Sequence, residues 1–247
     1  MSMAQQTIIK PVERGIELLD RVDYRLADTQ EDKDTIYRLR YRAYLNEGAI
    51  EPNRDQKITD RFDDMPNSWI FGVYLDGRLA SSIRLSISSP EHVMCPSVDV
   101  FRDYLQQEVD QGKVMVDPTR FVADPDFAGQ FPELPYITLR LCFVACSYFN
   151  ADLGLATVRA EHRSFYKRLF NHQPLSPPRI YPGLTKPICL MAVDFPASRE
   201  KVFARYPYLR SSYFERRMLF ERKNPPLAPA LGGSGFPFER ATIIPRS

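Results

Sequence analysis

The stretch VMVDPTRFV, residues 114–122, is the part of the chain from which its fold is inferred. Its β-branched and apolar residues predict a strand. Asp117 and Arg120 interrupt the apolar pattern, and residues three apart face opposite sides of a regular strand. Pro118 has no N–H to donate to a neighbouring strand, so it predicts a bulge or a break in the ladder at this point.

A bulge between Asp117 and Arg120 would bring both charges to one face of the sheet. Two interpretations of this pair stay open at this point. It is either a structural ion pair at a sheet edge, or an active-site carboxylate and guanidinium on a strand whose bend serves the site.

Length and composition indicate a globular protein. With 247 residues, 44% of them apolar, the chain can bury a full core, and one domain with extensions is expected. A formal net charge of +2 is too balanced to indicate a nucleic-acid partner. No apolar run reaches the ~18 residues of a membrane span, and the N-terminus lacks a signal-peptide hydrophobic region. We therefore expect a cytoplasmic protein.

The cysteines indicate neither a metal site nor a disulfide framework. Cys142 and Cys146 lie four residues apart in an apolar segment, and no histidine lies at ligand spacing from them. We therefore expect buried, reduced thiols and no metal.

Hydrophobic periodicity predicts strands alternating with helices. Strands are expected at 23–26, 69–75, 79–87, 114–122, 155–160 and 187–193, and helices at about 30–46, 97–111, 135–150, 164–170, 199–206 and 211–222. Thr29 is the expected cap of the first helix and Ser97 of the second, Asp76-Gly77 is typical of a tight hairpin, and Gly154 is expected to end the helix at 135–150. This order predicts an α+β (three-layer α/β) domain over residues 23–222, with helices on both faces of a mixed sheet. Residues 1–22 form an N-terminal extension, and the Pro/Gly-rich residues 223–247 form a tail.

Charged residues recur in or beside apolar segments before and within the interrupted strand: Arg40, Asp60, Asp63, Arg84, Asp117 and Arg120. Buried charges are costly unless they are paired, so these residues can form one network. Such a network can orient the amine and carboxylate of a small zwitterionic substrate, or it can be purely structural. Composition does not decide between the two.

The spacing of these residues resembles that of the acyl-homoserine-lactone synthases. Their pattern of Arg-x3-Phe, Asp-x2-Asp, Arg and Glu-x-Ser-Arg-Phe is similar to Arg40-x3-Tyr44, Asp60-x2-Asp63, Arg84 and Asp117-x-Thr119-Arg120-Phe121, and the match covers roughly residues 24–195. That family belongs to the GNAT superfamily of acyltransferases. The resemblance implies the GNAT fold, a mixed twisted sheet whose bulged central strand splays from its neighbour and leaves a cleft for an acyl thioester.

Several departures from the lactone synthases point to a related family. Ile50 stands where they carry a tryptophan of the region that holds S-adenosylmethionine, and Asp117 replaces their glutamate. The segments YRLRY (37–41) and YFERRMLF (213–220) are more similar to the N-acyl amino acid synthases (FeeM-like). Residues 123–135 are proline-rich and lack the usual pyrophosphate loop of coenzyme A acetyltransferases. The donor that this implies is a phosphopantetheine thioester on acyl carrier protein, with no bound cofactor.

The resemblance implies an N-acyltransferase that moves a long-chain acyl group to the amino group of an amino acid or small amine. Asp117 is expected to be the base or to position the ammonium, and Tyr166 to donate to the leaving thiolate. Arg120 with Arg84 is expected either to clamp a carboxylate or to hold the acidic residues in place. The other residues expected to contact substrate are Arg40, Tyr44, Asp60, Asp63, Thr119, Phe121, Phe143 and Val144, of which Phe121, Phe143 and Val144 would line the acyl chain. The acidic carrier protein is expected to dock on Arg163, Lys167 and Arg168.

Two other functions stay open. A lactone synthase would consume S-adenosylmethionine and release methylthioadenosine, and Ile50 argues against it. A non-catalytic GNAT-like protein would bind acyl thioesters without turnover. A lipid product also leaves room for peripheral membrane contact.

Overall fold

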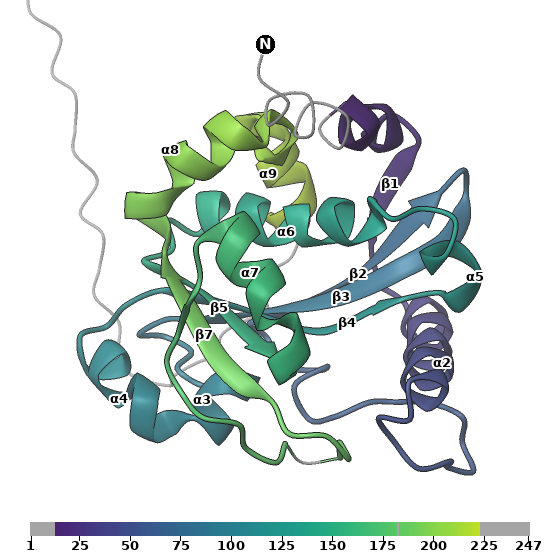
Figure 1. The fold of residues 1–247 in the computed structure, drawn as a ribbon, viewed down its shortest axis with the longest axis horizontal. Helices are drawn as coiled ribbons and strands as arrows, with labels where there is room; N and C mark the ends of the chain where they lie inside the picture. The colour runs from purple at the N-terminus through teal and green to yellow at the C-terminus, as the bar shows by residue number, and fades with distance from the viewer. Residues whose placement is uncertain (1–12, 182, 223–247) are drawn as a thin grey trace, which may run out of the picture.

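A seven-stranded sheet in the order β1-β2-β3-β4-β5-β7-β6 forms the centre of the computed structural model, which describes residues 13–181 and 183–222 (Figure 1). The strands are β1 (Val22–Leu26), β2 (Ser68–Leu75), β3 (Arg78–Ser88), β4 (Met115–Ala123), β5 (Leu153–Val158), β6 (Gln173–Pro174) and β7 (Cys189–Asp194). β4 and β5 are parallel, and the other neighbours are antiparallel. The sheet is therefore mixed, as predicted.

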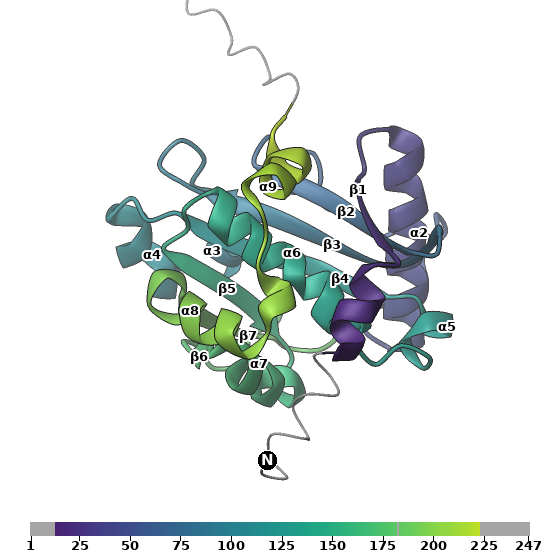
Figure 2. The same ribbon diagram turned by 90° about the horizontal axis from the view of Figure 1, so that it is seen from above.

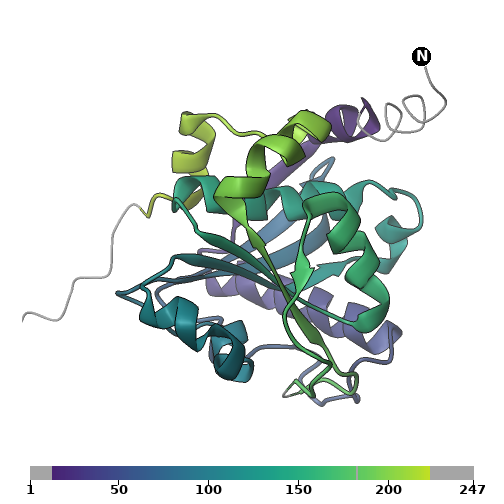
Figure 3. The same cartoon turned by 60° about the vertical axis from the view of Figure 1, so that its left-hand side comes forward.

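Helices cover both faces of this sheet (Figures 1 and 3). One layer holds α2 (Gln30–Asn46), α3 (Pro96–Val100) and α4 (Arg102–Asp110), and the other holds α6 (Leu134–Tyr148), α7 (Arg163–Phe170), α8 (Phe195–Arg205) and α9 (Tyr213–Phe220), with the short α5 (Pro125–Ala128) after β4. The largest hydrophobic cluster lies between the sheet and α6, which buries Ile137, Leu141 and Val144. The three layers confirm the predicted fold class.

Local sequence explains the elements that were predicted correctly. Thr29 caps α2 through a capping box with Asp32, which satisfies backbone N–H groups at the helix start. Asp76 and Gly77 have φ values of 49° and 77°, the left-handed pair that a tight β2–β3 hairpin requires.

Four predictions were wrong or incomplete. The helix expected at 97–111 is two helices, α3 and α4, with the buried Phe101 between them. Ser97 makes no side-chain cap of α3, since its Oγ donates to β4 instead. The chain leaves α6 through Asn150, whose φ is 51°, and Gly154 lies within β5. The two-residue β6 and the single turn of α5 are too short for a periodic signal.

β4 is both splayed from β5 and bulged against β3. β4 and β5 pair only at Met115–Leu153 and Val116–Gly154, whereas β4 stays paired with β3 as far as Ala123. Pro118 follows the last β5 pair by two residues, and it has no N–H to extend that ladder.

The bulge itself lies at Arg120 rather than at Pro118. Pro118 still pairs with Leu85, but Arg120 and Phe121 together oppose the single residue Ile83. Arg120 has a φ of 53°, which is uncommon for a residue with a side chain and typical of a bulge or a functional constraint.

The predicted limits of the domain fall partly outside the residues that the structure describes. Residues 13–19 are helical and lead into β1, while the first twelve residues of the expected extension and the expected tail, 223–247, lie outside the described residues. Within the described ranges no helix is long and apolar enough to cross a membrane. All four cysteines are described, and all are free.

Candidate active site

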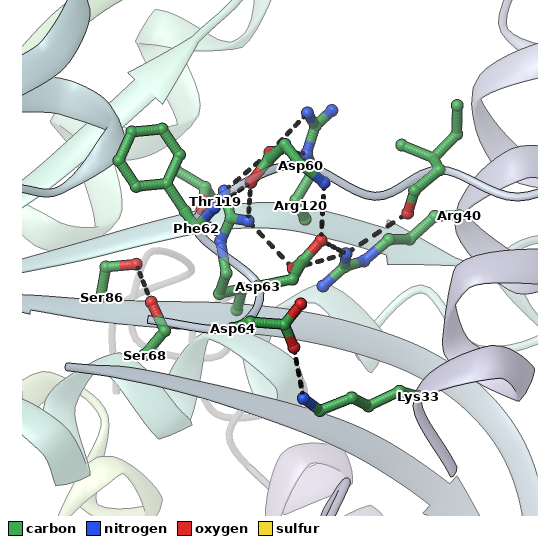
Figure 4. Close-up of polar contacts among 12 residues, drawn as sticks. Lys33, Arg40, Asp60, Phe62, Asp63, Asp64, Ser68, Ser86, Thr119 and Arg120 are labelled. Atoms are coloured by element: carbon green, nitrogen blue, oxygen red, sulfur yellow. Dashed lines mark hydrogen bonds and ion pairs between the residues drawn. The ribbon is translucent and has the colours of Figure 1, made fainter. Parts of the chain in front are cut away.

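Five charged side chains from four segments form one hydrogen-bonded network (Figure 4). Arg40 of α2 binds both oxygens of Asp63 at 2.8 and 3.0 Å, and Arg84 of β3 binds Asp63 at 2.9 Å. Arg84 also binds Asp60, and Arg120 of β4 binds Asp60 Oδ2 through Nη2 and Nε at 2.7 and 3.0 Å. The carboxylates thus link three guanidinium groups that lie far apart in sequence.

The loop between α2 and β2 holds the two carboxylates in place by its own backbone. The Phe62 N–H donates to Asp60 and the Asp60 N–H donates to Asp63, both at 2.9 Å. These short-range bonds fix a compact turn, which presents both acids to the arginines. The sequence spacing Asp-x2-Asp is what such a turn requires.

Burial makes this network energetically important. Arg40 and Arg84 are fully buried, and the side chain of Arg120 is 8% exposed. Burial by itself raises the pKa of Asp60, but the hydrogen bonds and charges of Arg84 and Arg120 outweigh it and hold that pKa well below its usual range. Burial lowers the pKa of Arg120, and the neighbouring Tyr44 and Asp60 more than reverse this. All three arginines against two carboxylates leave one net positive charge.

A cavity of about 430 Å³ occupies the gap between β4 and β5. It is lined by residues of both strands and of both helix layers: Tyr44, Glu47, Ala49, Pro118, Thr119, Arg120, Phe121, Val122, Ala123, Pro135, Leu139, Thr157, Val158, Arg159, His162, Phe165, Tyr166, Tyr181, Leu184, Lys186 and Ile188. Because β5 no longer pairs with β4 there, the cavity passes from the α6–α7 face to the α2 face of the sheet. Its volume is within the range of small-molecule sites.

A second, smaller cavity of about 30 Å³ continues beneath α6 and α7. It shares Pro118, Leu139 and Tyr166 with the first, and its other walls are almost wholly apolar, including Phe143 and Phe170. His172 also lines it, and burial lowers the pKa of this histidine to about 4, so the imidazole is neutral. The smaller cavity thus adjoins the larger one and lies in the apolar interior.

The structure brings some of the predicted site residues to these cavities and not others. Tyr44, Thr119, Arg120, Phe121 and Tyr166 line the larger cavity, and Phe143 lines the smaller one. Arg40, Asp60, Asp63, Arg84, Val144 and Asp117 line neither. Val144 is fully buried in the core between α6 and the sheet. Of the four charged residues that precede β4 in sequence, Asp60 binds Arg120 directly. Arg84 binds Asp60 and Asp63, and Arg40 binds Asp63, so these residues support Arg120 through the network.

Asp117 faces α3, away from the cleft. Its two oxygens accept hydrogen bonds of 2.7 Å from the backbone N–H and the hydroxyl of Ser97. Burial raises the pKa of Asp117, and the bonds from Ser97 oppose that change. Asp117 pairs with Ser86 and Thr119 pairs with Arg84, so Asp117 does share a face with the charged network, but it has no contact with Arg120.

Tyr166 lies where the two cavities meet. Burial raises the pKa of its hydroxyl well above the usual value, so the group is a proton donor at neutral pH. The predicted docking residues Arg163, Lys167 and Arg168 lie on the same helix, and Lys167 and Arg168 are exposed.

Comparison with known proteins identifies the family of this chain. The model of the N-acyl amino acid synthase FeeM family matches residues 35–194, well over half of the chain. The matched range includes every residue of the network and every residue that lines the cleft. The chain belongs to this family. The enzyme is thus an N-acyltransferase. None of the curated proteins matches the sequence.

Solved structures show the same fold. The structure of FeeM, an N-acyl amino acid synthase from uncultured soil microbes, superposes with a TM-score of 0.62 at 16% identity, covering 75% of this chain and 97% of that one. BjaI, a CoA-dependent acyl-homoserine lactone synthase with bound MTA, gives a TM-score of 0.54 at 14% identity, over 76% and 89% of the two chains. TofI, in a ternary complex with an inhibitor and MTA, gives 0.55 at 14% identity, over 77% and 100%.

Much of the enzyme's cleft was absent from the sequence prediction, including the polar residues Glu47, Tyr181 and Lys186. Glu47 follows α2 and pairs with Arg159 at 3.0 Å, while Lys186 donates to the Glu47 carbonyl at 3.1 Å. Tyr181 and Tyr44 both lie beside Arg120, whose Cζ is 5.9 and 5.8 Å from the centres of the two rings. They come from loops, where no periodicity marks a functional residue. His162, which ends the turn after β5, also lines the cleft.

Proposed function

We propose that the enzyme transfers a long-chain acyl group from the thioester of acyl carrier protein to the amino group of an amino acid. The observation that carries the proposal is the cleft between β4 and β5, which has a guanidinium on one side and an apolar cavity on the other. Membership of the N-acyl amino acid synthase family supports the reaction class. The donor and the acceptor are argued separately below.

The acceptor carboxylate binds Arg120. Asp60 occupies Nε and Nη2 of this arginine, and Nη1 has no hydrogen-bond partner among the described residues. The network carries a surplus positive charge, and Arg120 is the member that lines the cleft. Tyr44 and Tyr181 flank the guanidinium, which reduces its hydration and strengthens a charged hydrogen bond. Arg84 keeps Arg120 in place through Asp60 and does not touch the substrate.

The amine must lose a proton before or as it attacks. Asp117 was expected to take it, but both of its oxygens are bonded to Ser97 and it does not line the cleft. Glu47 and His162 line the cleft and can accept a proton, directly or through water. Arg159 contacts Glu47 Oε2 at 3.0 Å and His162 Nε2 at 2.8 Å, so Glu47 Oε1 and His162 Nδ1 are the atoms left for this role. We assign the base to this pair and assign Asp117 to the positioning of β4 against α3.

Acyl transfer then follows from the arrangement of β4 and Tyr166. The amine nitrogen attacks the thioester carbon, a C–N bond forms and the C–S bond breaks. Beyond Val116 β4 has no strand partner on its β5 side, and Pro118 has no N–H, so the oxyanion donors in this proposal are backbone N–H groups after Pro118 on that edge. Tyr166, protonated and at the junction of the cavities, donates to the departing thiolate.

The acyl chain extends from the cleft into the smaller cavity beside Phe143 and Phe170. At about 30 Å³ this space holds roughly one water molecule, so a long chain must displace side chains there. Phe121 lines the entrance from the cleft.

A carrier-bound donor is favoured over free coenzyme A by the segment after β4. GNAT acetyltransferases bind pyrophosphate there, but this chain carries Asp124 and Asp126 in and beside the single turn of α5. Asp124 is paired with Arg42 at 2.8 Å, so the exposed Asp126, which has no basic partner among the described residues, is the carboxylate that would repel phosphate. Lys167 and Arg168, exposed on the helix that borders the cleft, offer positive charge to an acidic carrier protein.

The proposal is tested with acyl carrier protein and coenzyme A thioesters of the same chain length, offered with a mixture of amino acids. Mass spectrometry should detect N-acyl amino acids, formed faster from the carrier-bound donor. Preference for the coenzyme A thioester would overturn the donor assignment alone. Methylthioadenosine release with S-adenosylmethionine would indicate lactone synthesis. Binding of thioester without turnover of any amine would indicate a non-catalytic protein.

A further inference from the structure

Helix α9 presents an apolar stripe to solvent. Tyr213, Phe214 and Met218 are 69%, 72% and 67% exposed, far more than apolar residues of the core. With Arg217 they occupy positions i, i+1, i+4 and i+5, which adjoin on one side of a helix. Figure 2 shows α9 on the outside of the layer that holds α6 and α8. We call these four residues the α9 stripe.

The opposite side of α9 is firmly attached to the enzyme. Glu215 accepts hydrogen bonds from the buried Arg140 of α6, one of them at 2.8 Å. Phe220 packs edge-on against Trp69, Phe71 and Phe149. The stripe is therefore held outward by packing on its inner side and cannot turn inward to be covered.

Charge around the stripe is positive. Residues 210–222 contain four arginines and two glutamates, a net charge of +2. Glu215 is bound to Arg140, and Glu221 pairs with Arg217. Arg216 and Arg222 donate to backbone carbonyls of Ser211 and Ser68 and have no acidic partner among the described residues. Arg216, three residues after Tyr213, lies at one edge of the stripe, whereas Arg222 stacks on Trp69, with its Cζ 4.4 Å from the ring centre, on the inner side of α9.

We propose that the α9 stripe docks the enzyme on an anionic lipid surface. Tyrosine and phenylalanine beside arginine are the composition of interfacial helices, in which apolar groups enter the headgroup region and cations meet lipid phosphates. A second copy of the chain is a poorer occupant, since two positive patches would face each other across the interface. The docking is independent of which acyl donor and acceptor the cleft takes.

The test is flotation of the full chain with vesicles of phosphatidylcholine, with and without phosphatidylglycerol. Binding is expected only to the vesicles that contain phosphatidylglycerol, and it should weaken with salt. Phe214→Glu with Met218→Glu should reduce the bound fraction roughly tenfold, because it removes apolar contact and adds charge that anionic lipid repels. The matched control is Leu175→Glu with Ile180→Glu, exposed apolar residues of another region, which should leave binding unchanged.

Circular dichroism melts of both variants separate loss of binding from loss of folding, since none of these four side chains is buried. Equal flotation of the native chain and the α9 variant would overturn the proposal. So would loss of flotation in Phe236→Glu with Phe238→Glu alone, which would place membrane contact in residues 223–247. Failure to float, with concentration-dependent dimers that the α9 variant abolishes, would show that a second copy occupies the stripe.

Discussion

Replacement of Asp60 by asparagine tests the charged network directly. Asp60 accepts hydrogen bonds from both Arg84 and Arg120, and it is the only acidic partner of Arg120 among the described residues. Asparagine keeps the shape and one acceptor oxygen but removes the charge. Breaking a buried ion pair on one side costs about 3–5 kcal/mol. With Asp60 20% exposed, we expect about 3 kcal/mol at neutral pH.

Urea unfolding at neutral pH measures this difference, and Asp64→Asn is the matched control. Asp64 lies in the same loop, but its side chain is 79% exposed, and within the described part of the chain it pairs only with Lys33. Its replacement should change the free energy of unfolding far less, because exposed pairs contribute little. Equal unfolding free energies for the two variants would refute the view that Asp60 supports a buried cation.

The pH dependence of the unfolding free energy provides a second test of Asp60→Asn. The pKa of Asp60 is lower in the folded state than in the unfolded chain, so its contribution is complete above about pH 4. It is lost as the pH falls below that value. The unfolding free energies of native chain and Asp60→Asn should therefore converge on acidification. A constant difference from pH 7 down to acid would mean that the variant acts through packing alone.

Three further predictions concern the reaction. Arg120→Lys should raise KM for the amino acid by about tenfold or more, because one ammonium cannot bind Asp60 and a carboxylate in the same way; steady-state kinetics with varied amino acid checks this. Asp117→Asn should keep kcat within about tenfold of native, and a fall of about 10² or more would restore its role as base. Lys167→Glu should raise KM for the carrier-bound donor and leave KM for a coenzyme A thioester unchanged, while Arg38→Glu on α2 alters neither.

The features that the sequence predicted correctly are those that depend on strand patterns and on short turns. The Asp76-Gly77 hairpin follows from local backbone preference. Asp60 and Asp63 were predicted as members of the charged network, but the turn that joins them was not predicted. A charged residue in an apolar strand is conspicuous in sequence, which is why Arg84 and Arg120 were found. Their mutual contacts through Asp60 are consistent with the predicted network.

The sequence did not indicate which side chains face the cleft. Asp117 and Arg120 share a face of the sheet, as expected. The bulge, however, lies at Arg120, whose backbone is left-handed, and Asp117 accepts hydrogen bonds from Ser97. Glu47 reaches the cleft from the C-terminal end of α2. No feature of the neighbouring sequence indicates that Glu47 lies in the cleft.

The sequence by itself determined the order of elements, the break that Pro118 makes in one edge of β4, and the set of charges that must be paired if buried. These follow from covalent geometry and from the cost of burying charge, which act locally. Only the tertiary structure decided which charge faces the cleft. That choice depends on the bulge at Arg120 and on the splay of β5, since a register shift of one residue moves a side chain to the other face of a sheet.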